Sequence, residues 1–431
     1  MRIRTLVTAV GLALGAWQCF SQTLEGQSRI ATAPISLTQA LQLAEDSNPG
    51  LRVKRAELAA SEGARTDANA FLYNNPVLGF DGIHREVPVD GAFAERRREW
   101  AATMQQTLEI AGQPGYRREA ADASMSALLR EIEDARRQLY ADVAQVYYRI
   151  LALQQRVDLE EQALSLFDTT AAAVERRRTA GEDTRLDSNV AAVEADRARN
   201  QAALAKEQLL DARSDLAAKL QLPEGRLPEA GGDLRSAPRP HYDLDALLTQ
   251  AALHPRLQAL AAREESARAK LKLENAARYP DVTVGLGLGR EGSSVARERL
   301  TTLTVSVPLP IFKQNAGNIG QASSALTQAE VSRAAAVRDT QAQVHALWTK
   351  LLSLKARLDR TQDRVLPALL DNQQLSVKSQ KAGQINLLEL IVVNRQALDA
   401  RRDLIDTLLD YQSTRIALEL AAGWPPEGVA P

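Results

Sequence analysis

The feature that most constrains this chain is a long run without helix breakers. From Tyr116 to Arg178 the sequence contains neither glycine nor proline. Apolar residues recur there every three or four positions, which is typical of one face of an amphipathic helix. About 60 residues at ~1.5 Å rise make a rod near 90 Å long, about twice the full thickness of a bilayer. Such a rod cannot bury itself in a compact globule, so we expect it to pack beside others and to project away from any membrane.

A second run, residues 321–379, has the same character and contains one proline, Pro367. Aromatic residues make up only 4% of the chain, and 53 Lys and Arg nearly balance 54 Asp and Glu. Balanced charge excludes a nucleic-acid binder that depends on bulk positive charge. The single cysteine excludes a disulfide scaffold. No apolar run in the sequence reaches the ~18 residues of a membrane-spanning helix.

The N-terminus predicts export. Residues 1–4 are basic and residues 6–17 form a short apolar core, which is typical of a signal peptide. We expect cleavage near Ser21, so that the mature chain begins at residue 22. An alternative is cleavage before Cys19 and lipidation of that cysteine, although the bulky Trp17 precedes it where small residues are preferred.

The body of the chain contains two copies of one pattern. Landmarks in the first half recur in the second at offsets of 201 to 207 residues, which indicates an internal duplication. The paired landmarks are Ser36 and Asp243, Pro76 and Pro280, Ile110 and Ile311, and Gly181 and Gly383.

The duplication predicts a domain organisation. It comprises a signal peptide (1–21), a first repeat (22–222), a Pro- and Gly-rich linker (223–242), a second repeat (243–423) and a C-terminal tail (424–431). In the first repeat we expect strands near 76–84 and 100–110 and long helices over 115–178 and 184–220. In the second we expect strands near 280–289 and 301–310 and long helices over 317–380 and 385–421.

The strands have the pattern of transmembrane β-strands. Apolar residues alternate with small or polar residues across 282–289 and again across 302–309, over the 9–11 residues that such a strand needs. The alternative is an exposed two-stranded sheet, which is marginally stable in water. Four strands cannot close a barrel, and about eight strands leave an interior filled by side chains. Three copies would supply 12 strands around an open lumen.

These residues resemble the TolC family of outer-membrane efflux factors over nearly all of 36–423. The resemblance is carried by the double repeat, by the Asn48-Pro49 and His254-Pro255 corners, and by the stretch Val307-Pro308-Leu309-Pro310-Ile311-Phe312. The stretch 108–113 is similar to the CzcC-like heavy-metal branch of that family. Residues 111 and 113–115 depart from the usual pattern of that branch.

The resemblance implies a mainly helical fold with a small membrane β-barrel. It implies a homotrimer with a 12-stranded barrel in the outer membrane of a Gram-negative bacterium, in contact with its lipid, and a long helical barrel in the periplasm. The implied partners are a periplasmic adaptor (membrane fusion protein) and an inner-membrane RND pump. The implied function is passive efflux, with heavy-metal cations as the expected substrate. Export of drugs or of proteins is the alternative, and a soluble periplasmic coiled-coil protein is a second.

Candidate functional residues lie at the turns between the long helices. The resemblance implies that these tips meet the adaptor, through Ala180, Gly181, Glu182, Ala382, Gly383 and Gln384. Just past the tips Asp187 and Glu389 lie 202 residues apart, at the same repeat position. In a trimer they would place six acids at the narrow end of the tube as a lumen gate. Helix capping is the other interpretation of both acids.

Other motifs fail. Gly287, Gly289 and Gly292 match the dinucleotide fingerprint, but neither the required helix nor the acidic residue follows. The four histidines have no partners at metal-ligand spacing. We therefore expect no enzyme activity, no cofactor, no bound metal and no nucleic-acid partner.

Overall fold

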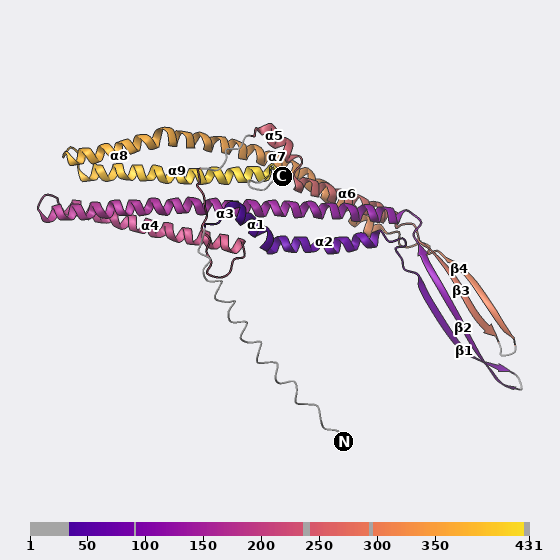
Figure 1. Cartoon of the computed structure of the whole chain (residues 1–431). Coiled ribbons are helices and arrows are strands. Elements are labelled where there is room, and N and C mark those ends of the chain that lie inside the picture. The colour runs from indigo at the N-terminus through magenta and orange to yellow at the C-terminus, as the bar shows by residue number, and fades with distance from the viewer. Residues whose placement is uncertain (1–33, 90–91, 236–241, 293–295, 426–431) are drawn as a thin grey trace, which may run out of the picture. The chain divides into compact units, whose positions relative to one another are not determined.

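The computed structural model describes residues 34–89, 92–235, 242–292 and 296–425 (Figure 1). The predicted signal peptide with Cys19, and most of the predicted tail 424–431, lie outside the described residues. Within them the chain forms long helices and one four-stranded antiparallel sheet. The predicted fold class, mainly helical with four strands, is confirmed.

The elements follow in two similar series. The first series contains α1 (Leu37–Ser47), α2 (Pro49–Ala68), β1 (Val77–Val89), β2 (Ala92–Leu108), α3 (Gln113–Thr179) and α4 (Arg185–Lys219). The second contains α5 (Leu244–Ala251), α6 (Pro255–Ala276), β3 (Val282–Gly292), β4 (Arg297–Ser306), α7 (Ala316–Arg360), a π-helical turn η1 (Thr361–Val365), α8 (Leu366–Lys381) and α9 (Leu387–Ala421).

The helix expected over 317–380 is divided by the turn η1. Pro367 lies two residues beyond η1, in the first turn of α8. Proline has no N–H group, and its ring collides with the carbonyl four residues earlier. The wider π-helical turn accommodates this collision, so the rod continues as α8 after one irregular turn.

The recurring Asn-Pro and His-Pro corners lie where the second helix of each short pair, α2 or α6, begins. Asn48 Oδ1 accepts a hydrogen bond from Leu51 N at 3.1 Å, and His254 Nδ1 accepts one from Arg256 N at 3.0 Å. The proline after each cap occupies the first helical position, where its missing N–H costs nothing. Both corners are therefore N-caps, of α2 and of α6.

The chain forms two compact units, and each draws on both predicted repeats. Unit 1 comprises the described residues up to 44 together with 143–235 and 357–410. Buried alanines line one face of its helix α4, at Ala191, Ala195, Ala198, Ala202 and Ala205. Alanine at such positions lets neighbouring helix axes approach closely.

Part of the predicted linker is packed within unit 1. Ile35 pairs with Ala230 as an isolated β-bridge, and Tyr147 donates a hydrogen bond to the Ile35 carbonyl at 3.0 Å. Leu234 is fully buried. These contacts fix the first half of the segment 223–242, so it is not a free tether.

Unit 2 comprises residues 45–142, 239–356 and 411–431, of which 90–91, 239–241, 293–295 and 426–431 lie outside the described part. An apolar cluster lies where α5, α7 and the end of α9 pack, around Leu247, Val344 and Leu418. Tyr242, Trp348 and Trp424 cover this cluster, and the Tyr242 and Trp424 rings lie 5.2 Å apart.

The sheet belongs to unit 2 and has the order β1-β2-β3-β4. The central pairing, β2 with β3, joins the two predicted repeats. At the hairpin turns the strands run beyond their expected ends, because the charged segments there continue the ladder to Arg297 and Gly292 in one hairpin and to Val89 and Ala92 in the other. At the opposite ends β2 stops at Leu108 and β4 at Ser306, before the expected residues 110 and 310. Among the helices of the described residues, none has a stretch long and apolar enough to cross a membrane.

Candidate functional site

The two faces of the sheet differ in chemistry. Because side chains alternate along a strand, the ladder places cross-strand neighbours on one face. One row joins Leu78, Met104, Leu286 and Leu303, and the next joins Phe80, Ala102, Leu288 and Thr301. The large apolar side chains of these rows are all exposed. A band of exposed apolar side chains on one face of the sheet is typical of strands that face lipid.

The opposite face carries small and polar side chains. One row joins Gly79, Thr103, Gly287 and Thr302, and the next joins Val77, Gln105, Gly285 and Thr304. A methyl group added at Gly79 would lie 2.7 Å from the Thr103 hydroxyl, and one added at Gly285 would lie 3.1 Å from Gln105. The glycines therefore leave room on a crowded polar face, which has the composition of a water-facing channel wall.

Exposed aromatic and aliphatic side chains flank the sheet where it meets the helices. Phe71 and Tyr73 precede β1, and Ile311 and Phe312 follow β4; all four are exposed. Aromatic side chains of this kind are enriched at membrane interfaces, where an amphipathic ring suits the headgroup region.

Both long helix pairs of unit 1 turn through the same backbone motif. Gly181 and Gly383 have φ of +83° and +72°, the left-handed conformation that glycine adopts without strain. Glu182 N donates to Arg177 O at 2.9 Å, and Gln384 N donates to Ser379 O at 2.9 Å. Gly181 N also donates to Arg178 O and Gly383 N to Gln380 O, both at 3.0 Å, which completes the hydrogen bonds of a Schellman cap at each turn.

The six predicted docking residues are exposed at these two turns. Their exposure leaves them available to a partner, and adaptor docking stays a prediction. The structure adds two residues that we did not single out, Leu186 and Leu388, which are 71% and 60% exposed. They lie 202 residues apart, at the same repeat position. That coincidence of an apolar residue just beyond each turn was the sequence signal that could have found them.

The two candidate gate acids each complete a helix cap. Thr184 Oγ1 donates to Asp187 Oδ2 at 2.6 Å, and Asp187 N donates back to Thr184 Oγ1 at 3.1 Å. The hydrogen bonds that the Thr184 hydroxyl and the Thr184 backbone N–H donate to the carboxylate lower the pKa of Asp187. Asn386 and Glu389 form the equivalent pair, with Glu389 N donating to Asn386 Oδ1 at 2.9 Å. Both acids therefore start helices, α4 and α9, and a further role in gating stays a prediction.

A polar contact joins the last turn of α3 to α4 near the first tip. Glu175 accepts hydrogen bonds from Arg178 Nη2 and from Ser188 Oγ, both at 2.6 Å. The bonds from Arg178 and Ser188 lower the pKa of Glu175 to about 2. The carboxylate therefore stays ionised and links the two helices on either side of the turn.

Two buried carboxylates hold α9 against its neighbours in unit 1. Glu160 of α3 accepts from both Arg402 and Arg156, with the Arg402 Nε bond at 2.8 Å and the Arg156 Nε bond at 2.7 Å. Glu194 of α4 accepts from Arg395 through two bonds of 2.7 and 2.5 Å. Paired guanidinium–carboxylate contacts of this kind are stronger than single bonds and fix the geometry of both partners.

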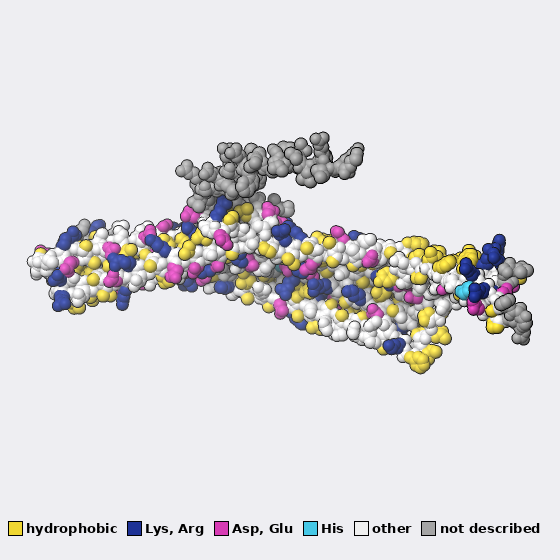
Figure 2. Space-filling model, turned by 90° about the horizontal axis from the view of Figure 1, so that it is seen from below, with side chains coloured by type: hydrophobic (Ala, Val, Ile, Leu, Met, Phe, Trp, Pro, Cys, Tyr) yellow, Lys and Arg dark blue, Asp and Glu magenta, His cyan; other side chains and the backbone are white. Residues whose placement is uncertain are grey.

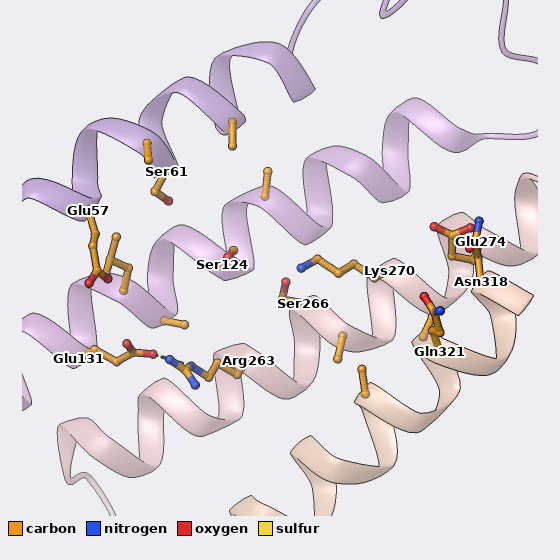
Figure 3. Close-up of a pocket in the computed structure, with 18 residues that line it drawn as sticks. Glu57, Ser61, Ser124, Glu131, Arg263, Ser266, Lys270, Glu274, Asn318 and Gln321 are labelled. Atoms are coloured by element: carbon orange, nitrogen blue, oxygen red, sulfur yellow. Dashed lines mark hydrogen bonds and ion pairs between the residues drawn. The ribbon is translucent and has the colours of Figure 1, made fainter. Parts of the chain in front are cut away.

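In unit 2 a groove of about 890 Å³ lies among α2, α3, α6 and α7 (Figure 3). Its walls are mainly alanine, serine and charged side chains, with Glu131 and Arg263 paired at 2.5 Å. Leu128 is its one large apolar lining residue. Such a lining holds water more readily than an apolar ligand.

The buried histidine His254 has a structural role. His254 donates from Nε2 to the Leu420 carbonyl at 2.9 Å, and burial lowers the pKa of its ring. No group of three or more His, Cys, Asp or Glu side chains among the described residues could hold a metal ion. The candidate functional features are therefore the face of the sheet that carries small and polar side chains and the two exposed turns of unit 1.

A comparison with known families decides the identity of the chain. Residues 40–220 and 248–424 match the outer membrane efflux protein family. The chain belongs to the outer membrane efflux protein family. It is therefore an efflux channel of the TolC family, located in the outer membrane of Gram-negative bacteria, and the family is one of channels rather than enzymes.

Individual relatives agree with this assignment. The chain is 28% identical over 378 residues to the cobalt-zinc-cadmium resistance protein CzcC of Cupriavidus metallidurans, covering 86% of each chain. It is 24% identical over 417 residues to the pyoverdine export outer membrane protein OpmQ of Pseudomonas putida, covering 91% of this chain and 87% of that one.

Solved structures share the fold of this efflux protein. The CusC channel superposes with a TM-score of 0.75 at 18% identity, covering 90% of this chain and 91% of CusC. The Campylobacter jejuni CmeC outer membrane channel superposes with a TM-score of 0.77 at 11% identity, covering 92% and 87%. These likenesses confirm the TolC-like fold expected from the sequence.

Proposed function

We propose that three copies of this chain assemble into a passive duct that exports heavy-metal cations through the outer membrane. The observation that best supports a channel is the difference between the two faces of the sheet: one carries apolar side chains, and the other carries small and polar side chains. Four strands per chain support a trimer, because about eight strands leave no open lumen and three copies supply twelve. Conductance in planar bilayers tests the channel, and a purified protein without conductance would contradict it.

The relationship to CzcC supports metal cations as the substrate, since it extends over 86% of both chains. The polar face of the sheet adds a chemical reason. Near the hairpin ends it carries Glu291 and Glu298, which are exposed and alternate with the lipid-facing residues of their strands. Carboxylates along a water-filled path attract cations and raise their local concentration.

The substrate is tested with a strain that lacks this chain. We expect growth of the deletion strain to become more sensitive to at least one of Co²⁺, Zn²⁺ and Cd²⁺, and an intact copy to restore tolerance. Unchanged tolerance to all three, in a strain whose purified channel still conducts, would refute the metal substrate and leave the channel standing.

A second substrate class has its own support. OpmQ, a pyoverdine export protein, matches 91% of this chain. Gln113 and Gly115 also depart from the usual sequence of the heavy-metal branch. Measuring siderophore in the medium of the same deletion strain separates the two: lost secretion with normal metal tolerance would favour the siderophore.

The two tips of unit 1 are proposed to dock a periplasmic adaptor that connects the duct to an inner-membrane RND pump. The exposed Leu186 and Leu388 support this, because an exposed leucine at both turns has no role in the core of its own unit. L186S and L388S should each reduce crosslinking to the adaptor in cells. Leu204 is also exposed, on α4 away from the turns, so L204S is the matched control. Equal crosslinking in all three variants would contradict docking at the tips.

The acids Asp187 and Glu389 are proposed to line the narrow end of the lumen as a cation gate. Their capping bonds use one carboxylate edge and leave both side chains accessible at the tips. D187N and E389Q remove the charge and keep an acceptor for the cap. We expect weaker block of single-channel conductance by divalent cations, and unchanged block would assign both acids to capping alone.

A further inference from the structure

Arginines gather on the lipid-facing side of the sheet, just beyond its apolar rows. The row after Phe80 and Leu288 contains Trp100, and it also contains Arg290 directly opposite Arg299. Further toward the hairpin turns the same face carries Arg98 and Arg297. We name these four residues the arginine cluster: Arg98, Arg290, Arg297 and Arg299. Figure 2 shows Lys and Arg side chains gathered beyond the hydrophobic surface at the strand end of the chain.

The alternation of charge in the sequence produces this arrangement. Arg98-Glu99, Arg290-Glu291 and Glu298-Arg299 each place the two signs on successive residues. Because successive side chains of a strand point to opposite faces, the arginines lie on the lipid-facing side and the glutamates on the channel side. In these three pairs the sheet separates opposite charges, whereas Glu86 and Arg96, which also lie on the lipid-facing side, pair with each other at 2.9 Å.

The four arginines of this cluster have no carboxylate partner in the part of the chain that the structure describes. A second facing pair provides the contrast: Arg85 lies opposite Arg97, but Arg85 contacts Glu99 at 3.3 Å and Arg97 contacts Glu95 at 2.8 Å. Like charges directly opposite each other destabilise a sheet. The facing Arg290 and Arg299 thus lack the counter-ions that the other pair has.

The position and chemistry of the cluster indicate which anion it fits. It follows an apolar band that ends in Trp100, at the depth where a membrane passes from acyl chains to headgroups. The planar guanidinium group matches phosphate through paired hydrogen bonds. The hairpin turns lie at the end of the strands away from the helices of unit 2 (Figure 1).

We propose that the arginine cluster binds the phosphate groups of lipid headgroups in the membrane leaflet farther from the helices. Continuity with the lipid-facing band selects a lipid over a free anion, because the same ligand can place its acyl chains on the apolar rows and its phosphates on the arginines. The bound phosphate neutralises the facing arginine pair, and the contact anchors the sheet at a fixed depth in the membrane. This inference is independent of the proposed substrate and needs only that the sheet lies in the outer membrane.

The test measures lipid binding to the full-length channel in detergent by native mass spectrometry. The probe is bisphosphorylated lipid A, and the comparison is the same lipid with its phosphates removed. R290Q/R299Q should weaken binding of the phosphorylated lipid roughly tenfold or more, since each basic residue near a membrane surface adds appreciably to binding of anionic lipid. R85Q/R97Q removes the same charge from the channel face and should change binding by no more than about twofold.

Four results would overturn the proposal. They are equal binding of the dephosphorylated lipid, complete displacement of lipid A by inorganic phosphate, an undiminished affinity of R290Q/R299Q, and an equal loss in R85Q/R97Q. Circular dichroism establishes that each variant is folded. Should the double variant misfold, R290Q alone gives the same test with an expected loss of about threefold.

Discussion

Replacing Glu160 with glutamine tests how much one buried carboxylate contributes to the stability of unit 1. The Glu160 side chain is 1% exposed and receives hydrogen bonds from Arg402 of α9 and from Arg156 of its own helix. Glutamine keeps the shape and one acceptor oxygen. It removes the negative charge that faces two guanidinium groups, and hydrogen bonding to this charge raises the pKa of Arg402.

The expected loss follows from burial. Removing one partner of a buried ion pair costs about 3–5 kcal/mol, because the other charge remains without compensation. The Arg156 and Arg402 side chains are each 23% exposed, so water solvates them in part. We therefore expect the lower end, about 3 kcal/mol, which lowers the melting temperature of a unit of this size by roughly 6–12 °C.

The neighbouring residue supplies the control. Glu161 pairs with Lys206 at 2.7 Å, as close as the Glu160 contacts, but these side chains are 50% and 59% exposed. E161Q should cost no more than about 1 kcal/mol. The assay is thermal unfolding of the purified channel in detergent, followed by circular dichroism, with R402M added to complete a double-mutant cycle. Equal shifts for E160Q and E161Q would refute the argument that burial, rather than distance, determines the strength of these pairs.

Three further substitutions have defined signs, all measured by the same unfolding assay. H254N keeps a cap acceptor, as Asn48 has at the equivalent corner, and removes a titrating group. Since burial holds the pKa of His254 below 6.5, the unfolded chain binds the proton first as the pH falls, so the wild type should lose stability below about pH 6.5 and H254N should lose less; an identical pH dependence would contradict this. G181A should destabilise by about 1–2 kcal/mol, because φ is +83° although no atom within 4 Å obstructs a methyl group. G63A should stabilise by about 0.4–1 kcal/mol, because Gly63 lies within α2 with open space around it; the same sign for both glycines would show that backbone conformation does not decide the outcome.

The elements that sequence reasoning predicted well are those fixed by local periodicity. The helical stripe of α3 and the alternation in β3 and β4 depend on residues close together in the chain. Strand ends were less predictable. The charged segments around Arg290 and Arg299 look like loops by composition, but backbone hydrogen bonds to a paired strand need no apolar side chain.

Contacts between residues far apart in the chain could not be predicted from the sequence. Glu160 and Arg402 are 242 residues apart, and nothing local distinguishes Glu160 from the exposed Glu161 beside it. Which acid becomes buried depends on the position of α9 against α3. The exposed Leu186 and Leu388 were missed for the opposite reason: a leucine in a helical stripe is expected in the core.

The two tips share a backbone but differ in chemistry. Both have a Schellman turn, a capping pair and one exposed leucine. The first tip then carries Glu182 and Asp183, whereas the second carries Gln384 and Ile385 at the same positions. A partner that contacts both kinds of tip can make the same apolar contact with each leucine, but it must meet acidic groups at one and neutral groups at the other. If both tips dock the adaptor as proposed, the leucines supply what its binding sites have in common. The acids then supply the difference that sets which adaptor surface meets which tip, and so fix the rotational register of the assembly.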